Sequence, residues 1–74
     1  MQPGDTYAEL MLAQRHIMDF KRRVARQQAL VDDLLARTHP LAPLAQRVLA
    51  ALNTSLAAAL FHADRLERAL EPQP

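Results

Sequence analysis

The chain has 74 residues, half of them hydrophobic, and nine basic and eight acidic side chains leave a formal net charge of +1. It contains no cysteine, no tryptophan and one glycine, which excludes a disulfide, a cysteine metal site, a thiolate nucleophile and a glycine-rich phosphate loop. The near-neutral balance gives no overall field toward nucleic acid or membrane, and a chain this small holds one domain that gains stability from a partner.

Two segments bear on where the protein resides. Residues 1–5 have neither the basic start nor the apolar region of a secretory signal. The most apolar stretch, residues 48–61, follows Arg47 and is interrupted by the polar residues 53–55. It falls short of the roughly 20 apolar residues that a membrane span needs. We therefore expect a cytoplasmic protein without a membrane partner.

The first long helix is predicted over residues 6–37. Thr6 and Glu9 have the spacing of a capping box, and neither glycine nor proline follows until Pro40. Apolar residues recur three and four residues apart, which places them on one face of a helix. That face consists of Leu10, Ala13, Ile17, Phe20, Val24, Val31 and Leu34.

A turn is predicted over residues 38–41 and a second helix over residues 41–71. Pro40 disfavours helical geometry at His39, and a helix tolerates proline only in its first turn, so Pro72 ends the second helix. Its apolar face continues without a polar interruption through Ala45, Leu49, Leu52, Leu56, Ala59, Ala63, Leu66 and Leu70.

Helices of nearly equal length joined by a short turn predict an all-α fold, an antiparallel two-helix hairpin of the coiled-coil kind. With the turn centred on residue 39, Phe20 lies level with Ala59, and Ala13 with Leu66. This alignment sets large side chains against small ones, as interdigitating layers require.

The second helix is apolar on more than the face that meets the first. The additional apolar residues are Leu41, Leu44, Val48, Ala50, Ala51, Ala57, Ala58, Leu60 and Phe61, and a shorter strip on the first helix comprises Tyr7, Met11 and Met18. Alanine favours helices and tolerates water, which is one explanation. We favour a second interface: a homodimer that closes a four-helix bundle and acts through protein–protein contacts, with Met11, Met18, Leu60 and Phe61 as contact residues.

Basic side chains gather on the first helix at Arg15, Arg22, Arg23 and Arg26. Such a face could lie against phosphates or an acidic protein. Asp19 stands at helical spacing from several of these arginines, so pairing within the helix is expected to take up much of their charge. We favour a solvated face, with a small RNA-binding hairpin regulator as the alternative function.

Gln27 interrupts the apolar face of the first helix. A buried amide costs stability unless it is hydrogen-bonded, and such residues can fix the register or the oligomeric state of helices. Gln27 either has that role or reaches water at the edge of the interface. The sequence leaves both interpretations open.

Few residues are suited to chemistry. His16 and His62 lie level on the predicted alignment, where two imidazoles could bind a metal ion or respond to pH. No acidic residue or cysteine completes a ligand set, so interfacial histidines are favoured. No Ser–His–Asp or Cys–His set is apparent, and we expect no catalytic residue, no cofactor, no metal ion and no enzyme activity.

One family resemblance is carried by residues 15–17, 22–27, 30–31 and Leu34. They resemble the R-H-I … R-R-I-x-R-Q core of a family of short, uncharacterised bacterial proteins, and the likeness extends over residues 13–70. Residues 20–21 are Phe-Lys where that pattern has Gly-Glu, and Pro40 stands where it has Asp. The resemblance implies a helical hairpin in a bacterial cytoplasm and no particular activity.

Overall fold

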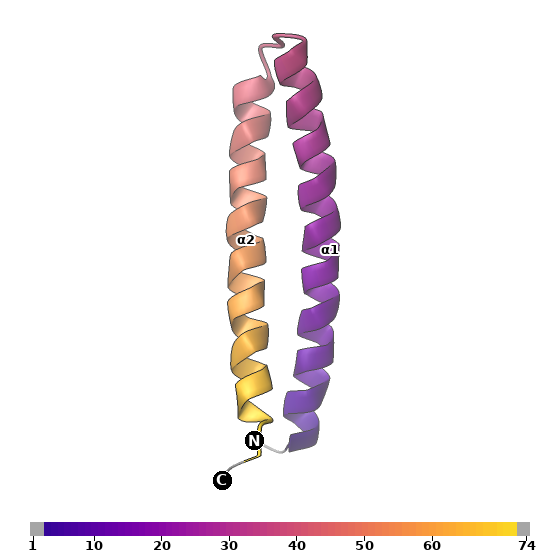
Figure 1. Ribbon diagram of the computed structural model, residues 1–74, viewed down its shortest axis with the longest axis vertical. Coiled ribbons are helices and arrows are strands. Elements are labelled where there is room, and N and C mark those ends of the chain that lie inside the picture. Colours follow the sequence, from indigo (N-terminus) through magenta and orange to yellow (C-terminus); the bar gives the residue numbers. More distant parts are fainter. Residues whose placement is uncertain (1–2, 73–74) are drawn as a thin grey trace.

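The computed structural model describes residues 3–72. They form two helices, α1 over Pro3–Ala36 and α2 over Ala42–Ala69, joined by a turn over residues 37–41. Figure 1 shows the helices side by side and antiparallel, with the start of α1 and the end of α2 at one end of the rod and the turn at the other. The rod measures 56 × 17 × 16 Å. The predicted all-α hairpin is confirmed.

The helix ends depart slightly from the predicted ones. Because a first helical turn accepts proline, α1 begins at Pro3 instead of residue 6. Thr6 therefore lies inside the helix instead of capping it, and its side chain is buried. The remaining ends, Ala36, Ala42 and Ala69, lie within two residues of the predicted positions.

The turn begins with a helix-ending motif centred on Thr38. The amide of Thr38 donates to the carbonyl of Leu35 (3.0 Å), and the amide of His39 donates to the carbonyl of Leu34 (2.8 Å). This pair of bonds closes an α-helix through a residue in the left-handed conformation, a position usually filled by glycine. Thr38 has φ of 50°, which is costly for a β-branched side chain.

His39 then holds the start of α2. Its Nδ1 accepts a hydrogen bond from the amide of Leu41 (3.1 Å), and its carbonyl accepts one from the amide of Ala42 (3.0 Å). Leu41, the capping residue of α2, offers no side-chain hydrogen bond of its own, and Pro43 occupies the first turn. The imidazole and carbonyl of His39 thus satisfy backbone amides that the helix start leaves open.

Thr38→Gly should raise the free energy of unfolding by about 1 kcal/mol, because glycine adopts a left-handed conformation without steric cost. The gain is reduced by the greater freedom of glycine in the unfolded chain. Urea unfolding at a fixed protein concentration measures it. In the matched control Thr54→Gly, at an exposed position within α2, the free energy should fall by roughly 0.5 kcal/mol. An equal loss from both variants would contradict strain at Thr38.

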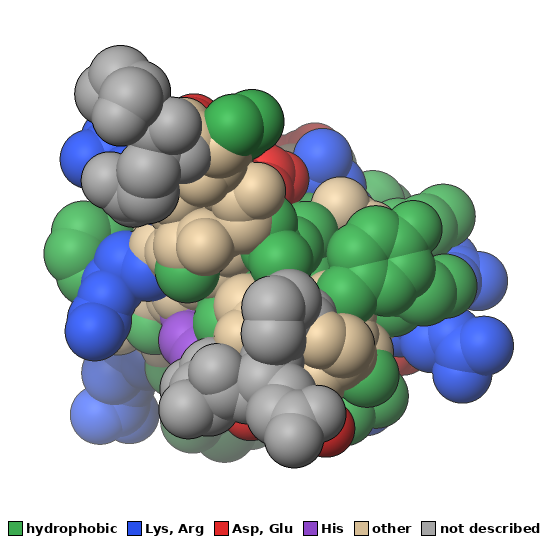
Figure 2. Space-filling model, turned by 90° about the horizontal axis from the view of Figure 1, so that it is seen from below, with side chains coloured by type: hydrophobic (Ala, Val, Ile, Leu, Met, Phe, Trp, Pro, Cys, Tyr) green, Lys and Arg blue, Asp and Glu red, His purple; other side chains and the backbone are tan. Residues whose placement is uncertain are grey.

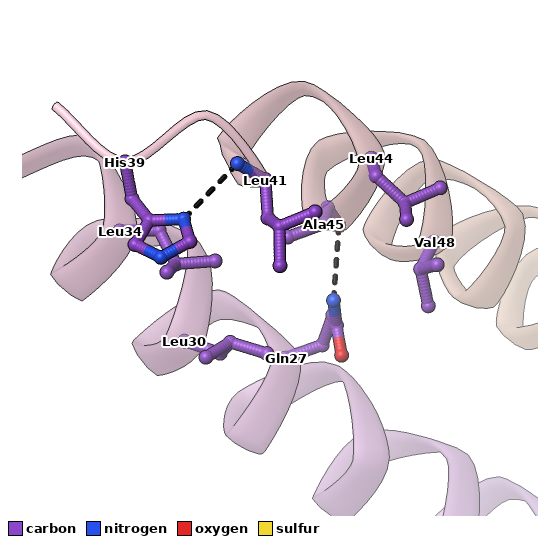
Figure 3. Close-up of a pocket in the computed structure, with 8 residues that line it drawn as sticks. All are labelled: Gln27, Leu30, Leu34, His39, Leu41, Leu44, Ala45 and Val48. Carbon is purple, nitrogen blue, oxygen red and sulfur yellow. Dashed lines mark hydrogen bonds between the residues drawn. The ribbon is translucent and has the colours of Figure 1, made fainter.

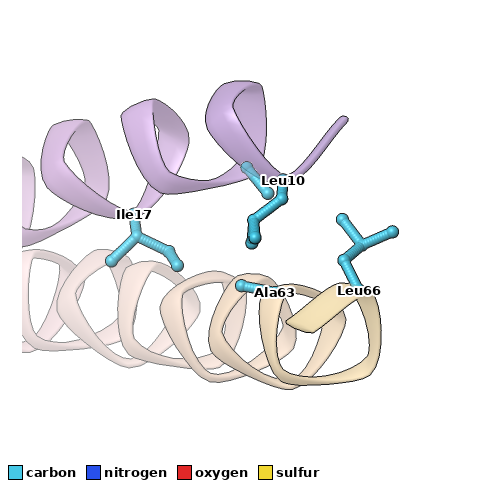
Figure 4. Packing of buried hydrophobic residues seen from close by; sticks show 5 residues of the cluster. Leu10, Ile17, Ala63 and Leu66 are labelled. Carbon is cyan, nitrogen blue, oxygen red and sulfur yellow. The ribbon is translucent and has the colours of Figure 1, made fainter. Parts of the chain in front are cut away.

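The interface between the helices is buried at its two ends. At the open end one cluster comprises Leu10, Ala13, Ile17, Ala63 and Leu66; Figure 4 shows its α1 and α2 side chains pointing toward each other. Beside the turn a second cluster comprises Val31, Leu34, Ala42 and Ala45. Ala13 and Leu66 share a cluster, as the predicted alignment expects.

The middle of the interface is only half-buried. The half-buried residues there are Phe20, Val24, Gln27, Leu49, Leu52, Leu56 and Ala59, all but Gln27 predicted as core. No large side chain among the described residues is completely buried. Two helices bury a single line of contact residues, which we call the seam, and leave both flanks of the seam open to solvent. The hydrophobic core of one chain is therefore incomplete.

Candidate functional site

The hairpin has two flanks, each built by both helices. A residue that precedes a seam residue by one lies about 100° to one side of it, and a residue that follows by one lies about 100° to the other. Leu30 precedes Val31, Val48 precedes Leu49, and together they line one hollow. The preceding positions of both helices therefore share one flank.

We name the two flanks by their contents. The groove face consists of the residues that precede seam residues: Glu9, Leu12, His16, Asp19, Arg23, Arg26, Leu30 and Asp33 of α1, and Leu41, Leu44, Val48, Ala51, Ser55, Ala58, His62 and Arg65 of α2. The methionine face, on the other flank, comprises Tyr7, Met11 and Met18 of α1 with Asn53 and Leu60 of α2. Figure 2, a view from the open end, shows hydrophobic side chains at the outer surface next to Lys and Arg.

Two adjoining hollows run along the groove face. The first, about 410 Å³, is lined by Gln27, Leu30, Leu34, His39, Leu41, Leu44, Ala45 and Val48, and Figure 3 shows the leucines and Val48 gathered around it from both helices. The second, about 430 Å³, is lined by Arg23, Arg26, Gln27, Leu30 and Leu52. Gln27 and Leu30 belong to both, so an apolar groove beside the turn continues into a basic hollow at mid-length.

Gln27 links the two helices at this groove. Its Nε2 donates to the backbone carbonyl of Ala45 at 3.0 Å, and the side chain is half-buried; Figure 3 shows the bond crossing from α1 to α2. An amide that only reached water would not hold a backbone carbonyl of the facing helix. The hydrogen bond therefore supports the register-fixing interpretation.

Gln27→Leu should raise the melting temperature while broadening the distribution of oligomers. The apolar side chain removes the cost of desolvating an amide, but it also removes a directional contact between the helices that favours a single register. Melting by circular dichroism and light scattering on a size-exclusion column measure the two effects. A single species identical in mass to the wild type would contradict a register role.

The structure brings together three of the four predicted contact residues. Met11, Met18 and Leu60 lie on the methionine face and are 52%, 60% and 45% exposed. Phe61, 66% exposed, stands two residues from seam residues on either side, so it lies on the back of α2, away from α1. The methionine face and Phe61 are therefore separate surfaces.

The four arginines also divide between two surfaces. Arg15 and Arg22 lie on the back of α1, whereas Arg23 and Arg26 line the basic hollow. Asp19 forms an exposed ion pair with Arg23 (3.1 Å), so the predicted internal pairing occurs there. Among the described residues, Arg15, Arg22 and Arg26 have no acidic partner, and their charges stay available.

The two histidines considered for a metal site lie at the surface of the hairpin. His16 and His62 are both exposed, and a hollow at the open end is lined by His62 with Thr6, Glu9 and Arg65 but not by His16. Within residues 3–72, no three acidic, histidine or cysteine side chains are placed to hold a metal ion.

The outer surface of α2 is unusually apolar. The sequence prediction counted only the most apolar stretch, residues 48–61, which is too short for a span. By length and composition alone, α2 as a whole is long and apolar enough to cross a membrane. This is weak evidence, because the core helix of a soluble protein has the same properties. Only 6% of the most apolar 18-residue window of α2 is fully buried within the chain, and its residues Leu52 and Leu56 are half-buried.

Comparison with known proteins adds no assignment. No family model matches the chain, and no curated protein or solved structure matches it. The resemblance of residues 15–27 to short bacterial hairpin proteins stays a prediction.

Proposed function

We propose that this protein is a non-enzymatic interaction module that forms a homodimer, two hairpins closing a four-helix bundle. The supporting observation is the surface that one chain leaves uncovered. Its accessible surface is 5796 Å², whereas a compact monomer of 8.3 kDa exposes about 4,600 Å². The excess is about 1,200 Å² per chain, which matches the roughly 1,000 Å² or more that each subunit of an obligate dimer buries.

The uncovered surface is apolar as well as large. The exposed large hydrophobic residues are Tyr7, Met11, Leu12, Met18, Leu30, Leu35, Leu41, Leu44, Val48, Leu60 and Phe61. Soluble monomers seldom expose this much apolar surface without a binding role. A second copy would cover part of it and would complete the burial of the half-buried interface.

The same proposal accounts for the apolar character of α2 without a membrane. A helix that is apolar on several sides is normally buried on several sides, and a four-helix bundle buries two sides of each helix. We therefore propose a soluble dimer in the cytoplasm. The face left uncovered by the second copy is then free for another protein.

The oligomeric state tests this proposal. Size-exclusion chromatography with light scattering, from low to high micromolar concentration, should give a mass twice the 8.3 kDa of the chain. A monomer across the whole range would overturn the proposal.

A second candidate function is binding of RNA or DNA by the arginines of α1. The observation in its favour is that Arg15 and Arg26 have no acidic partner among the described residues. Binding through phosphates should weaken steeply with salt and be lost in the double variant Arg22→Ala/Arg26→Ala. The matched variant Arg47→Ala/Arg65→Ala, on α2, should retain it. No binding of mixed RNA or DNA at low salt would remove this candidate.

A further inference from the structure

We infer that the second copy docks on the groove face in an antiparallel orientation, with the two turns at opposite ends of the bundle. The inference rests on the proposed homodimer and specifies its geometry. The two-fold axis lies between the two hairpins, perpendicular to the rods and at their mid-length. As a result, α1 faces α1 of the partner and α2 faces α2 of the partner. Such an interface is isologous, and every contact in it occurs twice.

The shape of the groove face supports this docking. Its two hollows, about 410 and 430 Å³, adjoin each other and are lined by both helices. Gln27 and Leu52, half-buried residues from the middle of the interface, are among the lining residues. A chain seated here would therefore cover the part of the seam that a single hairpin leaves open.

The charges of α1 are complementary to themselves in the antiparallel orientation. Asp19 and Arg26 lie seven residues apart on the groove face. An axis midway between them sets Asp19 of each chain against Arg26 of the other, and Arg26 has no acidic partner in its own chain among residues 3–72. The same axis, within one residue, sets Glu9 against Arg37, which also pairs with Asp33 in its own chain. It brings the two copies of Arg23 together as well, each paired with Asp19 of its own chain. Charge complementarity of this kind selects an orientation.

The side-chain sizes on α2 indicate the same axis. Near the middle of the groove face Val48 is bulky, whereas Ala51, Ser55 and Ala58, farther from the turn, are small. The antiparallel orientation lays Val48 of each chain over Ala58 of the other, large against small, as close packing requires. A parallel orientation would lay α2 of one chain over α1 of the other, and Val48 would not meet Ala58.

The levels of the two helices agree with a single axis. Ala13 shares a cluster with both Ala63 and Leu66, and Val31 shares one with both Ala42 and Ala45. By interpolation, the point midway between Asp19 and Arg26 lies level with about residue 53 of α2. That is also the midpoint between Val48 and Ala58. The charges of α1 and the side-chain sizes of α2 thus predict one two-fold axis independently.

Engineered cysteines test the geometry, and the absence of native cysteine makes the result unambiguous. Ser55 lies on the groove face within two residues of the axis, so the dimer sets its two copies across the interface, about 6 Å apart along the rods. Small movements of the helices then bring two cysteines at this position within reach of a disulfide. Asn53, at nearly the same level, lies on the methionine face. With oxidised glutathione, Ser55→Cys should give a disulfide-linked dimer on a non-reducing gel, and Asn53→Cys should stay monomeric on that gel.

Charge reversal tests the pairing. Asp19→Lys and Arg26→Glu should each raise the dissociation constant of the dimer about tenfold, because each sets like charges against each other across the interface. The double variant should restore the dissociation constant, because opposite charges then face each other again. Asp19→Lys also breaks the ion pair with Arg23, so the control is Asp64→Lys. It breaks a comparably exposed pair with Arg68 (3.1 Å) on the opposite flank, and should leave dimerisation unchanged.

The outcomes separate this inference from the proposed function. A monomeric wild-type chain would overturn both. A dimer in which Asn53→Cys cross-links as well as or better than Ser55→Cys, or in which neither cross-links, would overturn the groove-face geometry alone. Failure of the double charge variant to restore dimerisation would also overturn that geometry.

Discussion

Val31→Asp should abolish cooperative unfolding of the hairpin and leave most of the chain unfolded. Val31 is 3% exposed, the lowest exposure among the described hydrophobic residues, and belongs to the cluster beside the turn. A carboxylate there has no partner, and burying it costs about 3 kcal/mol or more, a large fraction of the stability of a small domain. Far-UV circular dichroism and urea unfolding measure the loss of helix.

Val48→Asp is the matched control, since it introduces the same change at a residue that is 42% exposed. At high protein concentration this variant should retain its helix, because the new carboxylate stays in water. It should still weaken the dimer, since Val48 lines the groove. If both variants lost helix equally, the distinction between an internal seam and an external groove face would be wrong.

Hundredfold dilution should lower the melting temperature of the wild-type chain by roughly 5 to 10 °C. When folding is coupled to pairing, dilution reduces the stability of the dimer by RT ln 100, about 2.7 kcal/mol, and a dimer of this size converts that loss into a shift of several degrees. Circular dichroism melts in cells of different path length measure it. The incomplete interior of one hairpin is the reason to expect the coupling.

Val48→Asp also serves as the control for dilution. Because it weakens pairing, its melting temperature should be lower than that of the wild type at every concentration. A wild-type melting temperature that is the same before and after dilution would show that one hairpin is stable alone. The apolar groove would then have no part in folding.

The hairpin itself is predictable from the sequence. Apolar residues at alternating spacing of three and four define one helical face, and Pro40 marks the only break between two such faces. The start of α1 is less predictable, because Thr6 and Glu9 have capping-box spacing while Pro3 is equally acceptable in a first turn. The structure includes Pro3 in the helix, and Thr6 becomes a buried residue.

The candidate interaction surfaces are only partly predictable. Leu41, Leu44 and Val48 stand out in the sequence as surplus apolar residues, but nothing local joins them to Leu30, since that requires knowing which flank of α1 meets which flank of α2. The apolar character of Leu60 and Phe61 likewise suggested that the two residues belong to one contact surface. One residue step turns a helix by about 100°, which places Phe61 on a different surface from Leu60.

By itself, the sequence determined that this protein is a pair of amphipathic helices with more apolar surface on the second than the first can cover. Periodicity determines this, because it is a property of each helix alone. Only the tertiary structure decided where that surface is concave, which arginines lie beside it and how deeply the seam is buried. Those features depend on the relative level and rotation of α1 and α2, which the seam contacts and the Gln27–Ala45 hydrogen bond establish.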